Sequence, residues 1–318
     1  MYLFLETKDI KKQLGVVIIG IVMVLVSFIP IYKLYKEDYG GARFQQVAIQ
    51  GSNAEKTKIF IENYVSHFSF DFLFIKGDAN PRSQMPGYGQ MFIITLPLLL
   101  TGLYVIVKAK DRKLWLVVIL LLLSVIPASL TKESPHALRS IAAAPFISII
   151  SAMGVYFLYL VSKKKPAITV FFVSLYLIFF LSYFREFNNN YAQKYSNDWQ
   201  YGYYNLFTNE SFRNETSPIY VSDEYGQPYI FNAFYNKIHP EMARNMNIYN
   251  PPDMWGFSVV SRWGHEVNYR VDMLDEPCNG CLVYMAGDDV LNLPGEEIGT
   301  IKFLDGKDAF IIYRTYHE

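Results

Sequence analysis

The sequence has little charge and few of the short motifs that usually reveal an enzyme. Charged residues make up only 18% of the 318 residues, and 29 Lys and Arg balance 29 Asp and Glu. This balance favours neither nucleic acid nor an acidic partner. Serine nucleophile elbows, Walker loops and HExxH motifs are absent from the sequence. Met1–Gln13 is charged and polar, and no small-residue cleavage site follows the next apolar run, so no signal peptide is expected.

The chain has only 2 cysteines, in the short motif Cys278-Asn-Gly-Cys281. A thioredoxin-type pair lies at the start of a helix, whereas Cys281 opens a predicted strand. A zinc site needs two further ligands, and the histidines at 239, 265 and 317 lack ligand spacing. We therefore expect no metal and no cofactor, and either a local disulfide or two free thiols.

Long apolar runs are what the sequence does contain. They occupy 14–32, 91–107, 114–130, 141–161 and 166–184, and each is about long enough to cross a bilayer as a helix. Hydrophobic residues reach 52%, with 25 Tyr and 24 Phe, and tyrosine suits a membrane interface. The sequence predicts a polytopic α-helical membrane protein with about five transmembrane helices.

The basic clusters predict the orientation of these helices. Lys8–Lys12, Lys108–Lys113 and Lys163–Lys165 fall on alternate loops. Because positive charge stays inside, the amino terminus is predicted to be cytoplasmic. The outer loop 35–90, the turn between the third and fourth runs, and everything after Phe184 are then extracytoplasmic.

A change of composition near Arg185 predicts a domain boundary, with a transmembrane domain over 1–184 and a second domain over 185–318. In the second domain, Pro218–Ser222 is a predicted strand and Gln227–Lys237 a predicted helix. Further strands are expected over Phe257–Arg262, Val267–Arg270 and Cys281–Ala286. The hairpin signal Leu304-Asp-Gly-Lys307 lies between two alternating apolar runs. This order of elements favours a small extracytoplasmic α/β or α+β domain.

The outer loop 35–90 is long enough to suggest a functional segment. Ser52 or Asn53 can cap a helix over Ala54–His67, which we expect to lie on the membrane surface. Phe68–Ile75 is predicted to be extended. The following loop, Gly77–Gln90, has Arg82 as its only cation, and a solvated loop residue is an open alternative to a binding role.

The turn between the third and fourth runs gathers four ionisable residues: Lys132, Glu133, His136 and Arg139. Arginine offers a fixed fork to phosphate oxygens, and lysine offers a point charge, so the turn is a candidate anion site at the lipid surface. In the alternative interpretation, Lys132 and Arg139 only reach the lipid headgroups as membrane anchors.

The turn carries a family resemblance. Pro135-His-Ala-Leu-Arg139, then Ala144-Pro145 and an apolar, glycine-containing helix, resembles a late hairpin of membrane glycosyltransferases of the GT-C fold, of the protein mannosyltransferase and aminoarabinose transferase types. The stretch Asn63–Gln90 and Tyr225-Gly-Gln-Pro228 resemble uncharacterised bacterial members. The resemblance covers about Asn63 to Tyr235.

The resemblance implies a sugar donor carried on a polyprenyl phosphate, which we expect to be bound by Arg139, His136, Lys132 and Arg82, and an acceptor hydroxyl on a glycan or protein. It places the catalytic carboxylate in a first outer loop, which this sequence lacks, so we expect a carboxy-terminal portion of a longer enzyme. Glu133 and Asp71 are the only acids considered as replacements. The other open hypothesis is a non-catalytic, membrane-anchored module that binds a glycan or a protein.

Overall fold

A computed structural model describes residues 10–36, 46–163, 165–241, 247–249, 259–263, 267–268, 280–287 and 294–316. The chain divides into two compact units, of which one holds helix α1 and the other holds the remaining helices and the sheet. The predicted boundary near Arg185 stays a prediction, because the larger unit contains residues on both sides of it.

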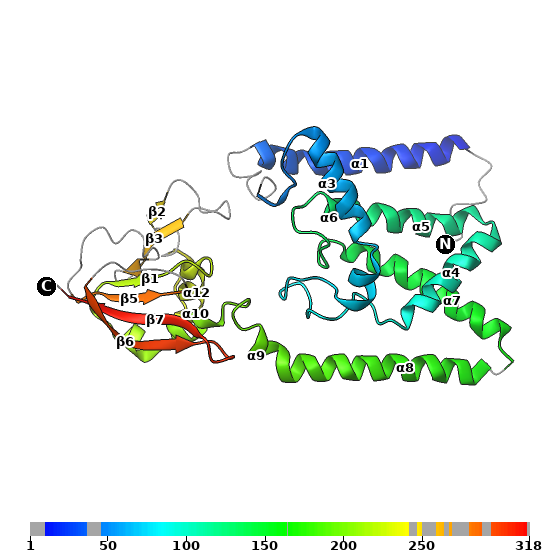
Figure 1. Cartoon of the computed structure of the whole chain (residues 1–318). Coiled ribbons are helices and arrows are strands. Elements are labelled where there is room, and N and C mark those ends of the chain that lie inside the picture. Colours follow the sequence, from blue (N-terminus) through cyan, green and yellow to red (C-terminus); the bar gives the residue numbers. More distant parts are fainter. Residues whose placement is uncertain are drawn as a thin grey trace. The chain divides into compact units, whose positions relative to one another are not determined.

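Helices dominate the first two thirds of the chain (Figure 1). The α-helices of the described residues are α1 (Ile10–Lys36), α3 (Asn53–Ser66), α4 (Thr95–Ala109), α5 (Arg112–Ser124), α6 (Ile126–Ser129), α7 (Ala144–Val161), α8 (Lys165–Glu186), α9 (Ala192–Lys194), α10 (Tyr201–Thr208), α11 (Glu210–Arg213) and α12 (Pro228–Tyr235). Short helical turns of other types are η1 (Asp71–Ile75), η2 (Ile141–Ala143) and η3 (Phe187–Tyr191).

Within the described residues, 3 helical stretches are long and apolar enough to cross a membrane: Arg112–Ser129, Ile141–Val161 and Pro166–Lys194. They match three of the five predicted spans. The helices Ile18–Lys33 and Thr95–Ala109 are apolar but shorter. The run predicted over 91–107 becomes helical only at Thr95, because the backbone N–H of Met91 donates to the Leu73 carbonyl at 2.9 Å and holds these residues against the loop.

Helices α4 and α7 cross one another at two glycines (Figure 1). A Cβ atom added to Gly154 would lie 2.0 Å from the carbonyl oxygen of Leu98 on α4. One added to Gly102 would lie 1.8 Å from the carbonyl oxygen of Ile150 on α7. Only glycine permits backbones to approach this closely, as at small-residue helix interfaces in membranes.

Helix α3 begins at a complete capping box. The Ser52 hydroxyl accepts from the Glu55 backbone N–H, and the Glu55 side chain accepts from the Ser52 backbone N–H at 2.8 Å. Its far end contacts the rest of the unit: the Asn63 side chain donates to the Thr131 carbonyl at 2.9 Å. Ile61 and Val65 are exposed, as a helix on a membrane surface requires, but that placement stays a prediction.

The extended structure predicted over Phe68–Ile75 is wrong, because Asp71–Ile75 forms the π-helical turn η1. The aromatic residues Phe72 and Phe74 are both buried within this turn. Aromatic residues favour extended structure by propensity, and burial of Phe72 and Phe74 in the turn outweighs that preference here.

The last third of the chain contains a mixed sheet in the order β2-β3-β4-β1-β5-β7-β6 (Figure 1). The strand β1 is parallel to β4 and β5, and the other neighbours are antiparallel. The strands are β1 (Ile219–Val221), β2 (Asn247–Tyr249), β3 (Val259–Trp263), β4 (Val267–Asn268), β5 (Leu282–Met285), β6 (Gly295–Lys302) and β7 (Asp308–Thr315).

Local sequence signals account for much of this region. Strands β1, β3, β4 and β5 fall where strands were predicted, and the remaining residues of 257–262 and 267–270 lie outside the described part. The hairpin of β6 and β7 turns at Leu304-Asp-Gly-Lys307, and Pro228 opens α12. Tyr203 on α10 and Phe310 on β7 are fully buried in the core between helices and sheet.

Cys281 is buried and disulfide-bonded, which decides between the two alternatives that the sequence left open. Cys278 lies outside the described residues.

Candidate functional site

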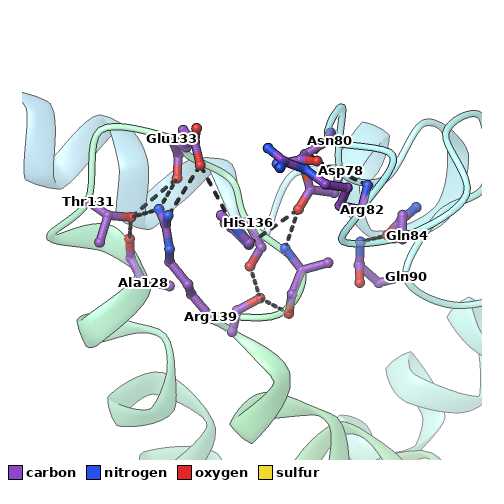
Figure 2. Close-up of polar contacts among 12 residues, drawn as sticks. Asp78, Asn80, Arg82, Gln84, Gln90, Ala128, Thr131, Glu133, His136 and Arg139 are labelled. Atoms are coloured by element: carbon purple, nitrogen blue, oxygen red, sulfur yellow. Dashed lines mark hydrogen bonds and ion pairs between the residues drawn. The ribbon is translucent and has the colours of Figure 1, made fainter. Parts of the chain in front are cut away.

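The turn between α6 and α7 holds the guanidinium of Arg139 in place. One guanidinium nitrogen of Arg139 donates to the Thr131 hydroxyl at 2.9 Å, and the other lies 3.2 Å from a carboxylate oxygen of Glu133 (Figure 2). The Thr131 hydroxyl in turn donates to the Ala128 carbonyl at 2.7 Å. The Arg139 side chain is therefore folded over its own turn, and it already holds an anion, the Glu133 carboxylate, which is exposed.

Two buried histidines join this turn to the end of α3. The backbone N–H of His136 donates to His67 Nε2 at 3.2 Å. Since Nε2 accepts, the proton of a neutral His67 lies on Nδ1, which donates to the Asn63 carbonyl at 2.7 Å. Burial lowers the pKa of His67 and of His136, and the nearby Arg139 lowers that of His136 further. Both imidazoles are thus neutral near pH 7.

Asp78 connects the loop Gly77–Gln90 to the turn between α6 and α7. One oxygen of its buried carboxylate accepts from the Ala137 backbone N–H at 2.7 Å, and the other accepts from the Asn80 backbone N–H at 2.9 Å. His136 Nδ1 lies 3.4 Å from the Asp78 carboxylate, but in a direction unsuited to a hydrogen bond, and it has no such partner among the described residues. Asp78 therefore anchors the loop and is not free to take up a substrate proton.

The structure brings together three of the predicted site residues and leaves three outside. Arg139, His136 and Glu133 are neighbours, with His136 Nε2 3.8 Å from the Glu133 carboxylate (Figure 2). Lys132 is exposed, and none of the ion pairs between described residues includes it. Arg82 is exposed too, and its backbone N–H donates to the Asn80 side chain at 3.0 Å.

Asp71, considered as a catalytic acid, lies outside the cluster. Its carboxylate forms an ion pair with Lys76 at 2.7 Å, and both side chains are exposed. An exposed pair of this kind contributes little to stability, and Asp71 is set apart by its position beside Lys76 rather than beside Arg139.

Sequence reasoning missed Asp78 and the role of His67. Asp78 is the only acid between Asp71 and Asp111, and an isolated acid in a glycine- and proline-marked loop was the available signal. No signal connected His67 to His136, because these residues are 69 positions apart.

The cluster suits an anion better than a metal ion. Among the described residues, no group of three or more His, Cys, Asp or Glu is arranged to hold a metal. The expectation that the protein uses no metal or cofactor stays a prediction. A guanidinium with an exposed lysine nearby, here Arg139 and Lys132, can bind a phosphate through charge-assisted hydrogen bonds.

In comparisons with known proteins, no family model, curated protein or solved structure matches the chain.

Proposed function

We propose that the Thr131–Ser140 turn binds the phosphate of a polyprenyl-linked sugar donor, and that the chain is part of a membrane glycosyltransferase. The observation that carries the proposal is the Arg139 guanidinium, which holds an exposed carboxylate at 3.2 Å beside a helix long and apolar enough to cross a membrane. A phosphate at the headgroup level presents oxygens of the same charge to the same donors.

In this proposal the phosphate replaces the Glu133 carboxylate on Arg139. The Glu133 side chain is 66% exposed, so it can turn away without losing a buried environment. The exposed Lys132 adds positive charge beside the incoming phosphate. The displaced Glu133 is then the carboxylate nearest to the site that is free to accept the proton of an acceptor hydroxyl. The bond from the sugar to the phosphate breaks as the acceptor oxygen bonds to the sugar carbon.

Binding of a fluorescent polyprenyl phosphate to the full chain in phosphatidylcholine nanodiscs tests this proposal. Arg139→Ala removes charge-assisted hydrogen bonds, and we expect a loss of roughly tenfold to a hundredfold in affinity. Arg139→Lys should recover only part of this loss, because lysine lacks the fork. Glu133→Gln should tighten binding, since a weaker competitor then occupies Arg139.

The matched control is Arg112→Ala, at an exposed arginine that begins α5. Equal affinity of the wild type, Arg139→Lys and Arg139→Ala would show that Arg139 is only a membrane anchor.

The finer arrangement is also proposed: five spans, a cytoplasmic amino terminus, and the turn and second domain outside. The alternating lysine clusters support it. Single cysteines introduced at Lys132 and Lys163, both exposed and at opposite ends of the stretch Ile141–Val161, test it in intact cells. A membrane-impermeant thiol reagent should label the cysteine introduced at Lys132 and not the one introduced at Lys163. The native Cys281 should add no background labelling, because it is already disulfide-bonded. Labelling at Lys163 and not at Lys132 would show the opposite orientation in the membrane.

One observation favours the second hypothesis, a non-catalytic membrane module that binds a glycan or a protein. Asp78 accepts two backbone N–H groups and Asp71 lies outside the cluster, so Glu133 is the one described carboxylate beside Arg139 whose partner a phosphate could replace. Donor binding without turnover by the purified chain would support the module. Turnover that Glu133→Gln abolishes would support the transferase.

A further inference from the structure

A cavity of about 600 Å³ lies between α4, α7 and α8, apart from the charged turn. The loop segment 84–92 covers one side of it, and its Gln84 and Gln90 side chains hydrogen-bond to each other. Leu98, Ile147 and Val155 supply apolar lining, and a wall of aromatic rings faces them: Tyr88, Phe92, Tyr176, Phe180 and Tyr183. The volume is in the range of sites that bind small molecules.

Ser151 is the unusual residue of this lining. Its side chain is buried, with 7% of the residue exposed, and its hydroxyl has no hydrogen-bond partner among the described residues. It lies halfway along Ile141–Val161, a stretch apolar enough to cross a membrane, where water is scarce. A buried hydroxyl without a partner is costly, so the site favours a ligand that supplies an acceptor.

Two other serines in helices of this unit have hydrogen-bonded hydroxyls, unlike Ser151. The hydroxyl of Ser124 donates to the Leu121 carbonyl at 2.7 Å, and that of Ser129 donates to the Val125 carbonyl at 3.0 Å. These back-bonds are the usual way for a serine to be satisfied within a helix. Two other hydroxyls of the lining, those of Thr95 and Tyr176, form a hydrogen bond with each other at 2.7 Å.

We propose that this cavity binds a lipid-soluble carbonyl compound, whose apolar body packs on the aromatic wall while its carbonyl oxygen accepts from Ser151. A polyprenyl chain has no oxygen along its length, so this ligand is distinct from the donor proposed for the turn. Two kinds of membrane molecule share the chemistry: an isoprenoid quinone and an acyl ester such as diacylglycerol.

Native mass spectrometry of the full chain in detergent tests the proposal with two matched probes, a long-chain ketone with its carbonyl in mid-chain and the alkane of the same length. We expect the wild type to prefer the ketone by roughly three- to tenfold, as for one neutral hydrogen bond. Ser151→Ala should remove this preference while both probes still bind. A short-tailed quinone and dioleoylglycerol, added as competitors, then distinguish the two sources.

Filling the cavity gives a second, independent measurement. Ala152→Phe, in the lining, should weaken both probes, whereas the matched control Ala167→Phe, at an exposed position of α8 outside the lining, should not. Size-exclusion profiles show whether both variants are folded. If Ala152→Phe does not fold, the Ser151→Ala measurement alone tests the proposal. Equal binding of ketone and alkane to the wild type, a preference that survives Ser151→Ala, or no binding of either probe would overturn the proposal.

Discussion

At the scale of single residues, Asp78 is the position on which the site depends most. Its buried carboxylate accepts two backbone N–H groups, from Ala137 and Asn80. Asp78→Ala leaves both donors without their partner, and that of Ala137 is buried. A lost hydrogen bond to a charged group costs about 1.5–3 kcal/mol. We expect a lower midpoint of thermal unfolding for the full chain in detergent, measured by tryptophan fluorescence.

Asp71→Ala is the matched control, because Asp71 has only its exposed ion pair with Lys76. Such pairs contribute about 0–1 kcal/mol. If Asp78→Ala lowers the midpoint no more than Asp71→Ala does, the anchoring role assigned to Asp78 is wrong.

At the scale of elements, the crossing of α4 and α7 depends on its glycines. A methyl group at Gly154 would meet the backbone of Leu98, which cannot rotate away as a side chain can. Gly154→Ala therefore forces the helices apart, and overpacking of this kind costs about 1–3 kcal/mol. Unfolding by a denaturing detergent should occur at a lower detergent fraction than for the wild type.

Gly20→Ala provides the comparison, because nothing lies within 4 Å of a Cβ atom added to Gly20 on α1. Alanine has the higher helix propensity, by up to about 1 kcal/mol, so this variant should be neutral or more stable. Equal destabilisation by both substitutions would argue against a specific crossing at Gly154.

At the scale of the whole molecule, acid should act on the two parts of the chain at different pH. The pKa values of His67 and His136 are lowered by burial, so their contribution to stability is complete above their ordinary value of 6.5 and is lost as the pH falls below it. Glu215 is different: its hydrogen bond from Arg314 lowers its pKa from 4.5 to about 2, so its contribution is lost only between these values.

We therefore expect the turn to open to solvent before the sheet does as the pH is lowered from 7. Hydrogen exchange, corrected for intrinsic rates, measures this at the backbone N–H groups of His136 and Ala137 and at those of β5 and β7. Replacing His67 with Gln should reduce the pH dependence at the turn and leave the sheet unchanged. Loss of protection in the sheet first would contradict this assignment.

Much of the fold follows from patterns within a few residues of one another, and these the sequence determines. Ser52 and Glu55 mark the start of α3, Pro228 the first turn of α12, and Asp305-Gly306 the hairpin, because caps and turns are built from neighbouring backbone groups. The long apolar runs predict their helices for the same local reason. Arg139, His136 and Glu133 were expected together since one short turn carries all three.

The tertiary structure alone decides the remainder of the site and two of the element boundaries. Asp78 reaches Ala137 across 59 positions and His67 reaches His136 across 69, and no short-range pattern records such a pairing. Packing of Phe72 and Phe74 makes a helical turn of a segment whose aromatic residues favour extended structure, and a hydrogen bond to Leu73 delays the start of α4. Each of these depends on a surface that exists only once distant segments have come together, so the sequence determines the helices and their caps, while packing decides which buried groups meet.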